Sequence, residues 1–150
     1  MAIENASHCA VLRTLNVVGD IWALGILRCV FYGQHRYTEI QRELGIATNV
    51  LADRLNALVD HGILERVPYQ DRPLRHEYVL TPKGTDLGAA IVALREWGRR
   101  HLDWDQTPPP LRHTTCGGAI DTVTVCRGCE EHIDLSEVEM PAQLAYTPRP

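Results

Sequence analysis

Two short helical patterns joined by a tight link are the feature that most constrains this fold. The first pattern stops at Gly45, and only Ile46-Ala47 separates it from the second. So short a link leaves no room for a loop, and the two helices must pack together to cover their apolar sides. Their expected buried positions are Ile40 and Leu44 in the first helix and Leu51, Leu55 and Leu58 in the second.

Capping signals set the expected boundaries of the helices. Thr38 followed three residues later by Gln41 fits a capping box, and Thr48 or Asn49 can cap the second helix, which Gly62 ends. Upstream, helical spacing from Val11 to Trp22 is interrupted at Gly19-Asp20, and residues 21–32 form another apolar helical pattern. The sequence therefore predicts two helices in front of the tightly linked pair.

A β-hairpin and a further helix are expected after this pair. Residues 63–69 and 76–80 have strand composition, and the charged segment 70–75 between them predicts the turn. Thr81-Pro82 fits an N-cap followed by proline at the first helical position. The helix that they open would direct inward Leu87, Ile91, Leu94 and either Trp97 or Leu102. The predicted fold is α+β, mainly α: a winged helix-turn-helix with extra helices at both ends.

The remaining face of the second helix carries side chains that can contact DNA bases. Asparagine can bind adenine through two hydrogen bonds, and alanine or a threonine methyl group can contact a thymine methyl group. Three arginines lie where phosphates or the minor groove would be met. Double-stranded DNA is thus the expected partner, and its candidate contacts are Thr48, Asn49, Ala52, Asp53, Asn56, Arg36, Arg72 and Arg75.

The net charge of −4 is unevenly distributed along the chain. Residues 1–102 contain 12 basic and 11 acidic side chains, whereas residues 103–150 contain 3 and 8. The acidity therefore belongs to the tail, and DNA affinity would have to come from a local basic face. Arg54 is ambiguous in this respect: it can contact a phosphate, or it can pair internally with Asp53, Glu39 or Glu43.

Six stretches in the right order between Cys9 and Leu102 resemble the HxlR-type regulators, a winged-helix branch related to the MarR group. They are Cys9-Ala-Val-Leu-Arg-Thr-Leu15, Gly19-Asp-Ile-Trp-Ala-Leu-Gly-Ile-Leu-Arg28, Arg36-Tyr-Thr-Glu-Ile40, Leu51-Ala-Asp-Arg-Leu55, Asp60-His-Gly-Ile-Leu-Glu-Arg66 and Arg75-His-Glu-Tyr-Val-Leu-Thr-Pro-Lys-Gly84. The resemblance implies a homodimer paired through its first and last helices, and an operator of two inverted half-sites about one helical turn apart. Ala47 departs from the pattern, because relatives often have a serine cap there.

The leading functional hypothesis is therefore a transcriptional regulator, a repressor rather than an activator, that responds to redox state, electrophiles or a small-molecule effector. A winged-helix protein-interaction module without DNA binding is the alternative, which the near-neutral front part and Asp53 favour. A thiol enzyme using Cys126 and Cys129 is disfavoured because no βαβ pattern surrounds them. A regulator of this kind is not expected to be an enzyme. Because the sequence shows neither an apolar membrane-spanning stretch nor a secretory signal, we expect it in the cytoplasm with no membrane partner.

Two cysteines and two tryptophans in the front part have competing interpretations. Cys9 matches an N-terminal cysteine that senses oxidants or electrophiles in some relatives, and His8 and Arg13 could lower its pKa. The alternative is an inert, half-buried cysteine in the dimer interface. Cys29, Trp22 and Trp97 lie on apolar helix faces, and we expect them in the core.

The tail combines His113-Thr-Thr-Cys116 with Cys126-Arg-Gly-Cys129, while residues 119–125 alternate like a ribbon strand. Two ligand pairs with two-residue gaps suit tetrahedral zinc, although His132 competes as the fourth ligand. A thiol cluster without metal and a redox pair are the alternatives, so zinc is a candidate cofactor rather than a certain one. The expected organisation is a DNA-binding and dimerisation domain at 1–104, a proline-rich linker at 105–110, and an acidic Cys/His tail at 111–150.

Overall fold

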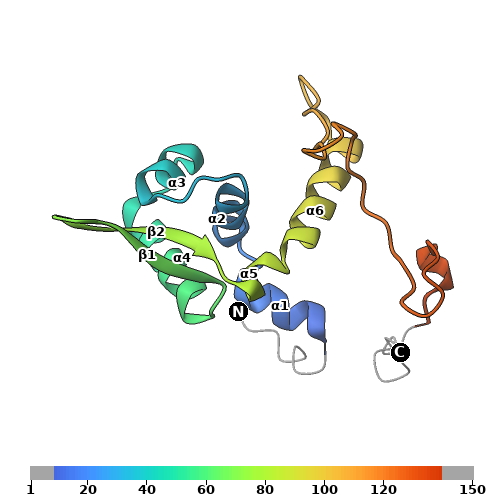
Figure 1. The fold of residues 1–150 in the computed structure, drawn as a ribbon, viewed down its shortest axis with the longest axis horizontal. Helices are drawn as coiled ribbons and strands as arrows, with labels where there is room; N and C mark the ends of the chain where they lie inside the picture. The colour runs from blue at the N-terminus through green and yellow to red at the C-terminus, as the bar shows by residue number, and fades with distance from the viewer. Residues whose placement is uncertain (1–8, 140–150) are drawn as a thin grey trace, which may run out of the picture. The chain divides into compact units, whose positions relative to one another are not determined.

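The computed structural model describes residues 9–139, which are mainly helical and include one two-stranded antiparallel sheet (Figure 1). The chain divides into two compact units, Met1–Ile91 and Val92–Pro150. The elements are α1 (Ala10–Val18), α2 (Ile21–Phe31), α3 (Tyr37–Leu44), α4 (Thr48–Asp60), β1 (Leu64–Asp71), β2 (Leu74–Leu80), α5 (Pro82–Thr85), α6 (Gly88–His101) and the 3₁₀ turn η2 (Leu135–Glu137).

The predicted interruption at Gly19-Asp20 is confirmed, and Asp20 is the reason that α2 starts there. Its Oδ1 atom accepts hydrogen bonds from the backbone N–H groups of Trp22 and Ala23, at 2.9 and 3.1 Å. This cap satisfies donors that the first helical turn leaves without partners. Within the described residues, no single helix is long and apolar enough to cross a membrane; α1 and α2 meet that test only as a pair bent by 80°.

The start of α3 differs from the prediction. The N-cap is Arg36, whose backbone N–H donates to the Glu39 carboxylate at 3.0 Å, and the helix begins at Tyr37. The capping box expected at Thr38 and Gln41 was therefore wrong. A carboxylate three residues into the helix reaches back to the cap, and it thereby favours the earlier start.

The start of α4 is held by side chains of α3 rather than by its own cap. Its N-cap is Ala47, which forms no side-chain bond, so the cap predicted at Thr48 or Asn49 was wrong. Instead, the Thr48 hydroxyl accepts a hydrogen bond from Gln41 Nε2 at 2.8 Å, and the Tyr37 hydroxyl donates to the Thr48 carbonyl at 2.7 Å. These two bonds fix α4 directly against α3.

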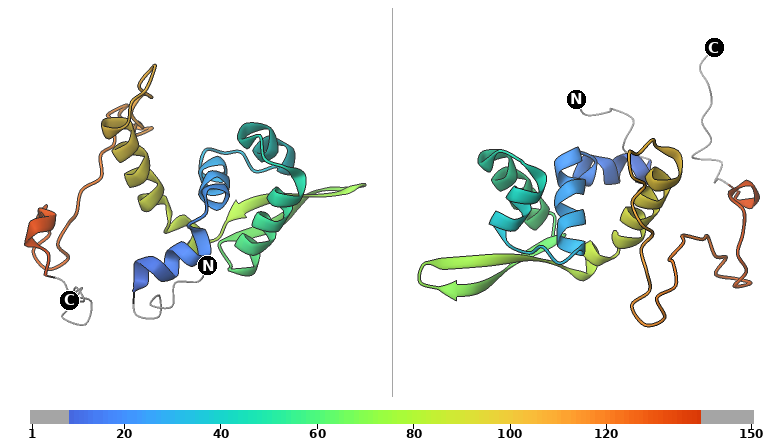
Figure 2. Two further views of the ribbon diagram at one scale, coloured as in Figure 1. Left: turned by 180° about the vertical axis from the view of Figure 1, so that it is seen from behind. Right: turned by 90° about the horizontal axis from the view of Figure 1, so that it is seen from above.

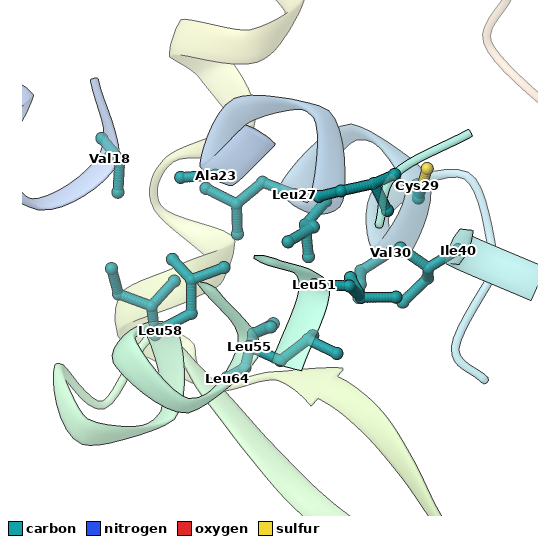
Figure 3. Packing of buried hydrophobic residues seen from close by; sticks show 13 residues of the cluster. Val18, Ala23, Leu27, Cys29, Val30, Ile40, Leu51, Leu55, Leu58 and Leu64 are labelled. Atoms are coloured by element: carbon teal, nitrogen blue, oxygen red, sulfur yellow. The ribbon is translucent and has the colours of Figure 1, made fainter. Parts of the chain in front are cut away.

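The core lies where α2 meets α3, α4 and the first residue of β1 (Figure 3). Full burial of a leucine or isoleucine side chain contributes about 1.5–3 kcal/mol. Both predicted stripes belong to this core, except that Leu44 is only partly buried, and Cys29 is buried as expected. The residues with 0–1% exposure are Ile26, Leu27, Cys29, Ile40, Leu51, Leu55, Leu58 and Leu64.

The strands β1 and β2 form a long hairpin, the wing, which projects away from α2, α3 and α4 (Figure 2). Pairing runs from Leu64 opposite Leu80 to Asp71 opposite Leu74, with an irregularity at Pro68/Gln70. The strands extend further than predicted, because most of the expected turn at 70–75 is paired and only Arg72-Pro73 remains between the strands. The wing therefore carries its arginines beyond the helices.

The single helix expected after Thr81-Pro82 is two helices. The cap is confirmed, since Thr81 Oγ1 accepts from the Gly84 backbone N–H at 3.1 Å, but α5 ends at Thr85. A Cβ on Gly84 would lie 2.2 Å from the Ile63 carbonyl oxygen, so only glycine permits α5 to approach the wing base this closely. Of the side chains expected inward, Leu87 and Ile91 pack against the core.

The rest of α6 is far more exposed than the sequence suggested. Leu94, Trp97 and Leu102 are 57%, 54% and 52% exposed, so the expectation that they point inward was wrong for this chain alone. Trp97 is consequently not a core residue, whereas Trp22 is partly buried against the core. The helical spacing was detected correctly, but in the part of the chain that the structure describes these side chains stay largely exposed.

The segment after α6 folds back along this helix. The Trp104 Nε1–H group donates to the Gly98 carbonyl at 3.0 Å, and the Arg95 guanidinium donates to the Pro109 carbonyl. Beneath them, Glu96 is buried, and its carboxylate is bound by Arg95 and Arg99. The segment predicted as a proline-rich linker thus packs against α6 in the second unit.

Candidate nucleic-acid interface

The face of α4 opposite the core presents the predicted base-contacting side chains. Thr48, Asn49, Asp53 and Asn56 are exposed, and Ala52 is partly buried. Leu51, Leu55 and Leu58 anchor the opposite face in the core, which fixes the rotation of the helix. The structure therefore brings all five candidates together on one surface, and their contacts with bases stay a prediction.

One of these candidates is already bound within the protein. Asn56 Oδ1 accepts a hydrogen bond from the guanidinium group of Arg66, on the first wing strand. Sequence reasoning missed Arg66, although its place two residues after the buried Leu64 could have indicated a side chain directed along α4. Asn56 therefore positions the wing arginine, and Asn49 is the less constrained base-reading candidate.

Arg36 connects the start of α3 to the wing. Its Nε atom donates to Glu77 Oε1 at 3.0 Å, and its guanidinium carbon lies 4.6 Å from the centre of the Tyr69 ring. The hydrogen bond to Glu77 is the main cause of the raised pKa of Arg36. A groove of about 310 Å³ lies here, lined by Arg36, Tyr37, Thr38, Tyr69, Arg75, His76 and Tyr78.

The remaining arginines divide into exposed and internally paired ones. Arg72 and Arg75 are exposed on the outer part of the wing, where phosphate contact was predicted. Arg54 is paired internally, but with Asp20 rather than with Asp53, Glu39 or Glu43: its Nε atom lies 2.9 Å from Asp20 Oδ2. Asp20 thus both caps α2 and neutralises an arginine of α4, which weakens the case for Arg54 as a phosphate contact.

Two features of α1, the residue Cys9 at its start and a cavity along it, are relevant to the predicted regulation. Cys9 is the N-cap residue of α1 and is partly buried, while His8 lies outside the described residues. A separate cavity of about 300 Å³ lies between α1, the wing base and α5, and two basic residues border it. It is lined by Arg13, Thr14, Val17, Val18, Ile63, Lys83 and Leu87.

The tail candidates form two separate pairs. His113 Nδ1 lies 3.3 Å from Cys116 Sγ, and the Gly128 backbone N–H donates to Cys126 Sγ at 3.4 Å. The Cys129 and Gly128 amides lower the pKa of Cys126, Cys129 most strongly. Between residues 9 and 139, no three His, Cys, Asp or Glu side chains are gathered for one metal ion, and the ribbon strand expected at 119–125 is absent.

Two helices joined by a tight link, followed by a long arginine-bearing hairpin, define a winged helix-turn-helix of the kind found in transcriptional regulators. The model of the HxlR-like helix-turn-helix family matches residues 17–106. The chain therefore belongs to this family, whose described members are regulators of transcription rather than enzymes.

Individual relatives agree with this assignment. The chain is 44% identical over 143 residues to the uncharacterized HTH-type transcriptional regulator Rv3095 of Mycobacterium tuberculosis, with 92% of this chain and 90% of the relative covered. The solved structure of PA1607, a candidate transcription factor, superposes with a TM-score of 0.80 at 34% identity and covers 91% of this chain and 96% of its own. The oxidized redox regulator HypR gives 0.60 at 31% identity, covering 64% and 100%.

Proposed function

We propose that this protein is a transcriptional repressor that binds an inverted-repeat DNA operator as a homodimer. The observation that carries the proposal is the exposed face of α4, with Thr48, Asn49 and Ala52 directed away from the core and the arginine-bearing wing beside it. In this arrangement α4 would enter the major groove and read base edges, and Arg72 and Arg75 would meet phosphates or the adjacent minor groove.

The homodimer is supported by apolar side chains that the single chain does not cover. On α1, Val11 and Leu15 are 65% and 50% exposed; on α6, more than half of Leu94 and Trp97 is exposed. A small monomer seldom leaves several large apolar side chains of its helices in water, and exposed tryptophan is typical of interfaces. A second copy of the chain is the partner that both helices would pair with, because a two-fold axis places the same surface on both sides.

Regulation by a thiol or a small molecule is supported by two features. The redox regulator HypR shares this fold, and Cys9 here is partly buried at the start of α1, one of the two helices assigned to the dimer. Oxidation or alkylation at that position would alter how the copies pair. The cavity between α1 and α5 would accept a small effector, and Arg13 and Lys83 favour an anionic one.

A mobility-shift titration with the DNA flanking its own gene tests the proposal. We expect a discrete complex whose affinity exceeds that for random DNA by a factor of about 10³ or more, and falls steeply with salt. A matched random duplex at the same salt concentration is the control. Equal affinity for both duplexes over the whole titration would refute an operator-binding regulator.

A protein-interaction module without DNA binding is the second candidate. It is favoured by two acidic features of the same surface: Asp53 is exposed on α4, and Glu77 neutralises Arg36. If the protein is such a module, neither duplex should bind measurably, even at low salt. A salt-dependent complex with DNA at micromolar protein would exclude it.

A further inference from the structure

The tail contains a structural repeat with a period of 13 residues that the sequence does not make obvious. In the first hairpin, the Ile120 N–H donates to the Leu111 carbonyl at 2.8 Å, and the His113 N–H donates to the Gly118 carbonyl at 2.8 Å. In the second, the equivalent bonds join Ile133 to Thr124 and Cys126 to Glu131, both at 3.0 Å. Every bonded position is shifted by the same 13 residues, which aligns His113 with Cys126 and Cys116 with Cys129.

The turns of the two hairpins also have the same backbone path. The Gly117 N–H donates to the His113 carbonyl, and the Glu130 N–H donates to the Cys126 carbonyl, both at 2.8 Å. Gly117 and Glu130 have φ angles of 71° and 61°. A positive φ is uncommon for a residue other than glycine, so the hairpin imposes it on Glu130. We call these two turns, residues 113–118 and 126–131, the knuckles.

Each knuckle holds its two candidate ligands on the same side of a tight turn. His113 Nδ1 and Cys116 Sγ are 3.3 Å apart. Two ligands of a tetrahedral zinc ion, with Zn–N near 2.0 Å and Zn–S near 2.3 Å, are separated by about 3.5 Å. In the second knuckle, the Gly128 N–H donates to Cys126 Sγ, a contact that stabilises a thiolate. The first pair is therefore already arranged as a bidentate ligand, and the matching backbone hydrogen bonds give the second pair the same backbone path.

Little else in this part of the chain could hold the two hairpins in place. Between residues 111 and 133 nearly every side chain is exposed, and only Leu111, Cys126 and Ile133 are partly buried. A segment that cannot bury a core of its own requires a cross-link if it is to remain ordered. Residues 121–123 alone join the hairpins, so the two knuckles are never far from each other along the chain.

We propose that the two knuckles close on one zinc ion bound by His113, Cys116, Cys126 and Cys129. The three cysteines bind as thiolates and release their protons to solvent, and the histidine binds through a neutral ring nitrogen. In the described residues the two pairs stand apart, and the metal supplies the link between them. His132 is excluded from the ligand set because the repeat aligns it with Ala119, outside the knuckle, where it bridges to Val125.

A redox disulfide between Cys126 and Cys129 is the competing use of these cysteines. It would explain the second knuckle alone, since a disulfide cannot form between His113 and Cys116. The repeat places a ligand-type side chain at all four matched positions, and a single metal ion accounts for all of them. The metal site is therefore the better explanation of the whole arrangement.

Metal analysis of the full-length protein, purified without chelator, tests the proposal. We expect one zinc per chain, and replacement by Co²⁺ should give the intense visible absorption of a tetrahedral ion with thiolate ligands. Removing the zinc should make residues 111–133 sensitive to protease and leave the first unit, which contains the winged helix-turn-helix, folded. Well under half an equivalent of zinc with three freely titratable tail thiols, or a Cys126–Cys129 disulfide in place of the metal, would overturn the proposal.

Matched histidine variants test the ligand set. His113→Ala should lower zinc affinity by more than about 100-fold, since even groups outside the ligand shell contribute 10–100-fold. His132→Ala should retain wild-type affinity, and the reverse order would contradict the ligand set. Circular dichroism checks that both variants retain the helix content of the wild-type protein. If a variant fails that check, the asparagine variant at the same position, His113→Asn or His132→Asn, replaces it in the comparison.

Discussion

The Nε atom of Arg36 lies 3.0 Å from Oε1 of Glu77, and this contact ties the start of α3 to the second wing strand. A cation of the proposed DNA-binding surface is thereby partly neutralised by the protein itself. Both side chains are partly exposed, so DNA can still compete for the guanidinium group. Substituting Arg36 should therefore change the affinity for DNA only if its guanidinium group contacts a phosphate.

We predict that Arg36→Ala weakens binding to all DNA sequences and lowers the slope of log affinity against log salt by about one. Glu77→Gln is the matched control: it removes the opposing charge and should leave affinity equal or higher. Fluorescence anisotropy at several salt concentrations measures both. A loss of affinity in Glu77→Gln as large as in Arg36→Ala would show that the contact acts by positioning the wing.

The wing and α4 should differ in the kind of DNA contact that they make. Arg72→Ala or Arg75→Ala should weaken specific and random binding alike, because each removes a contact to phosphate or the minor groove. Asn49→Ala should instead reduce the preference for the operator by about 1–3 kcal/mol, the value of a good base contact. Parallel titrations on operator and random DNA compare them, and an identical effect of both changes would contradict this division.

The proposed dimer predicts a strong effect at one exposed aromatic residue. Trp97→Glu should convert the dimer to a monomer, because a charge would have to be buried where the indole packs. Leu74→Glu is the control, since Leu74 is also highly exposed but lies at the tip of the wing. Light scattering at micromolar protein measures the mass. A monomeric wild-type protein at that concentration would refute the dimer.

Stability should depend on the face of α4 that enters the core. Leu55→Ala removes a side chain with no exposure, and we expect a loss of about 2–5 kcal/mol in the free energy of unfolding. Val67→Ala, at a 40% exposed position of β1, should change it by no more than about 0.5 kcal/mol. Urea denaturation of both variants gives these values, and equal losses would place the core elsewhere.

Glu96 should make stability depend on acid pH. The pKa of this buried carboxyl group is lowered from 4.5, first by the hydrogen bond from Arg99. A carboxylate with a lowered folded-state pKa stabilises the protein above its unfolded value, and that contribution disappears as the pH falls through the folded value. Glu96→Gln should therefore lower the melting temperature at pH 7, and the difference should shrink below pH 4.5. A difference independent of pH would contradict this account.

Hydrophobic periodicity predicted most of the winged helix-turn-helix, because its helices are amphipathic and its core is formed by helices that are close in sequence. The stripes Leu51, Leu55, Leu58 and Ile40 were assigned correctly, since each is buried by a neighbouring helix. The caps were less predictable: Glu39 favours a start at Arg36, which is not a usual N-cap residue type, and Gln41 bonds to Thr48 across two helices, a contact that local spacing does not show. Trp97 illustrates a further limit, because an apolar helical position predicts burial, whereas in this structure more than half of the side chain is exposed.

The sequence predicted which face of α4 carries the candidate site, but not which other side chains its residues contact. Spacing alone placed Asn49 and Asp53 opposite the core, whereas the contacts of Asn56 with Arg66 and of Arg54 with Asp20 join segments that only the fold brings together. In the tail, the two ligand pairs were visible in the sequence. Their common hairpin geometry was not, because it depends on backbone hydrogen bonds that residue types do not encode.

The contact between Arg95 and the Pro109 carbonyl has a practical consequence for dividing the chain into fragments. The prolines suggest a fragment boundary before residue 108, yet a fragment ending there would lack the Pro109 carbonyl that accepts from Arg95, and also Pro108, which lies beside α6 with Trp104. A fragment meant to retain a native α6 should therefore extend at least through Pro110. For the same reason, lengthening the chain between Asp105 and Pro108 would loosen α6 itself rather than merely increase the reach of the tail.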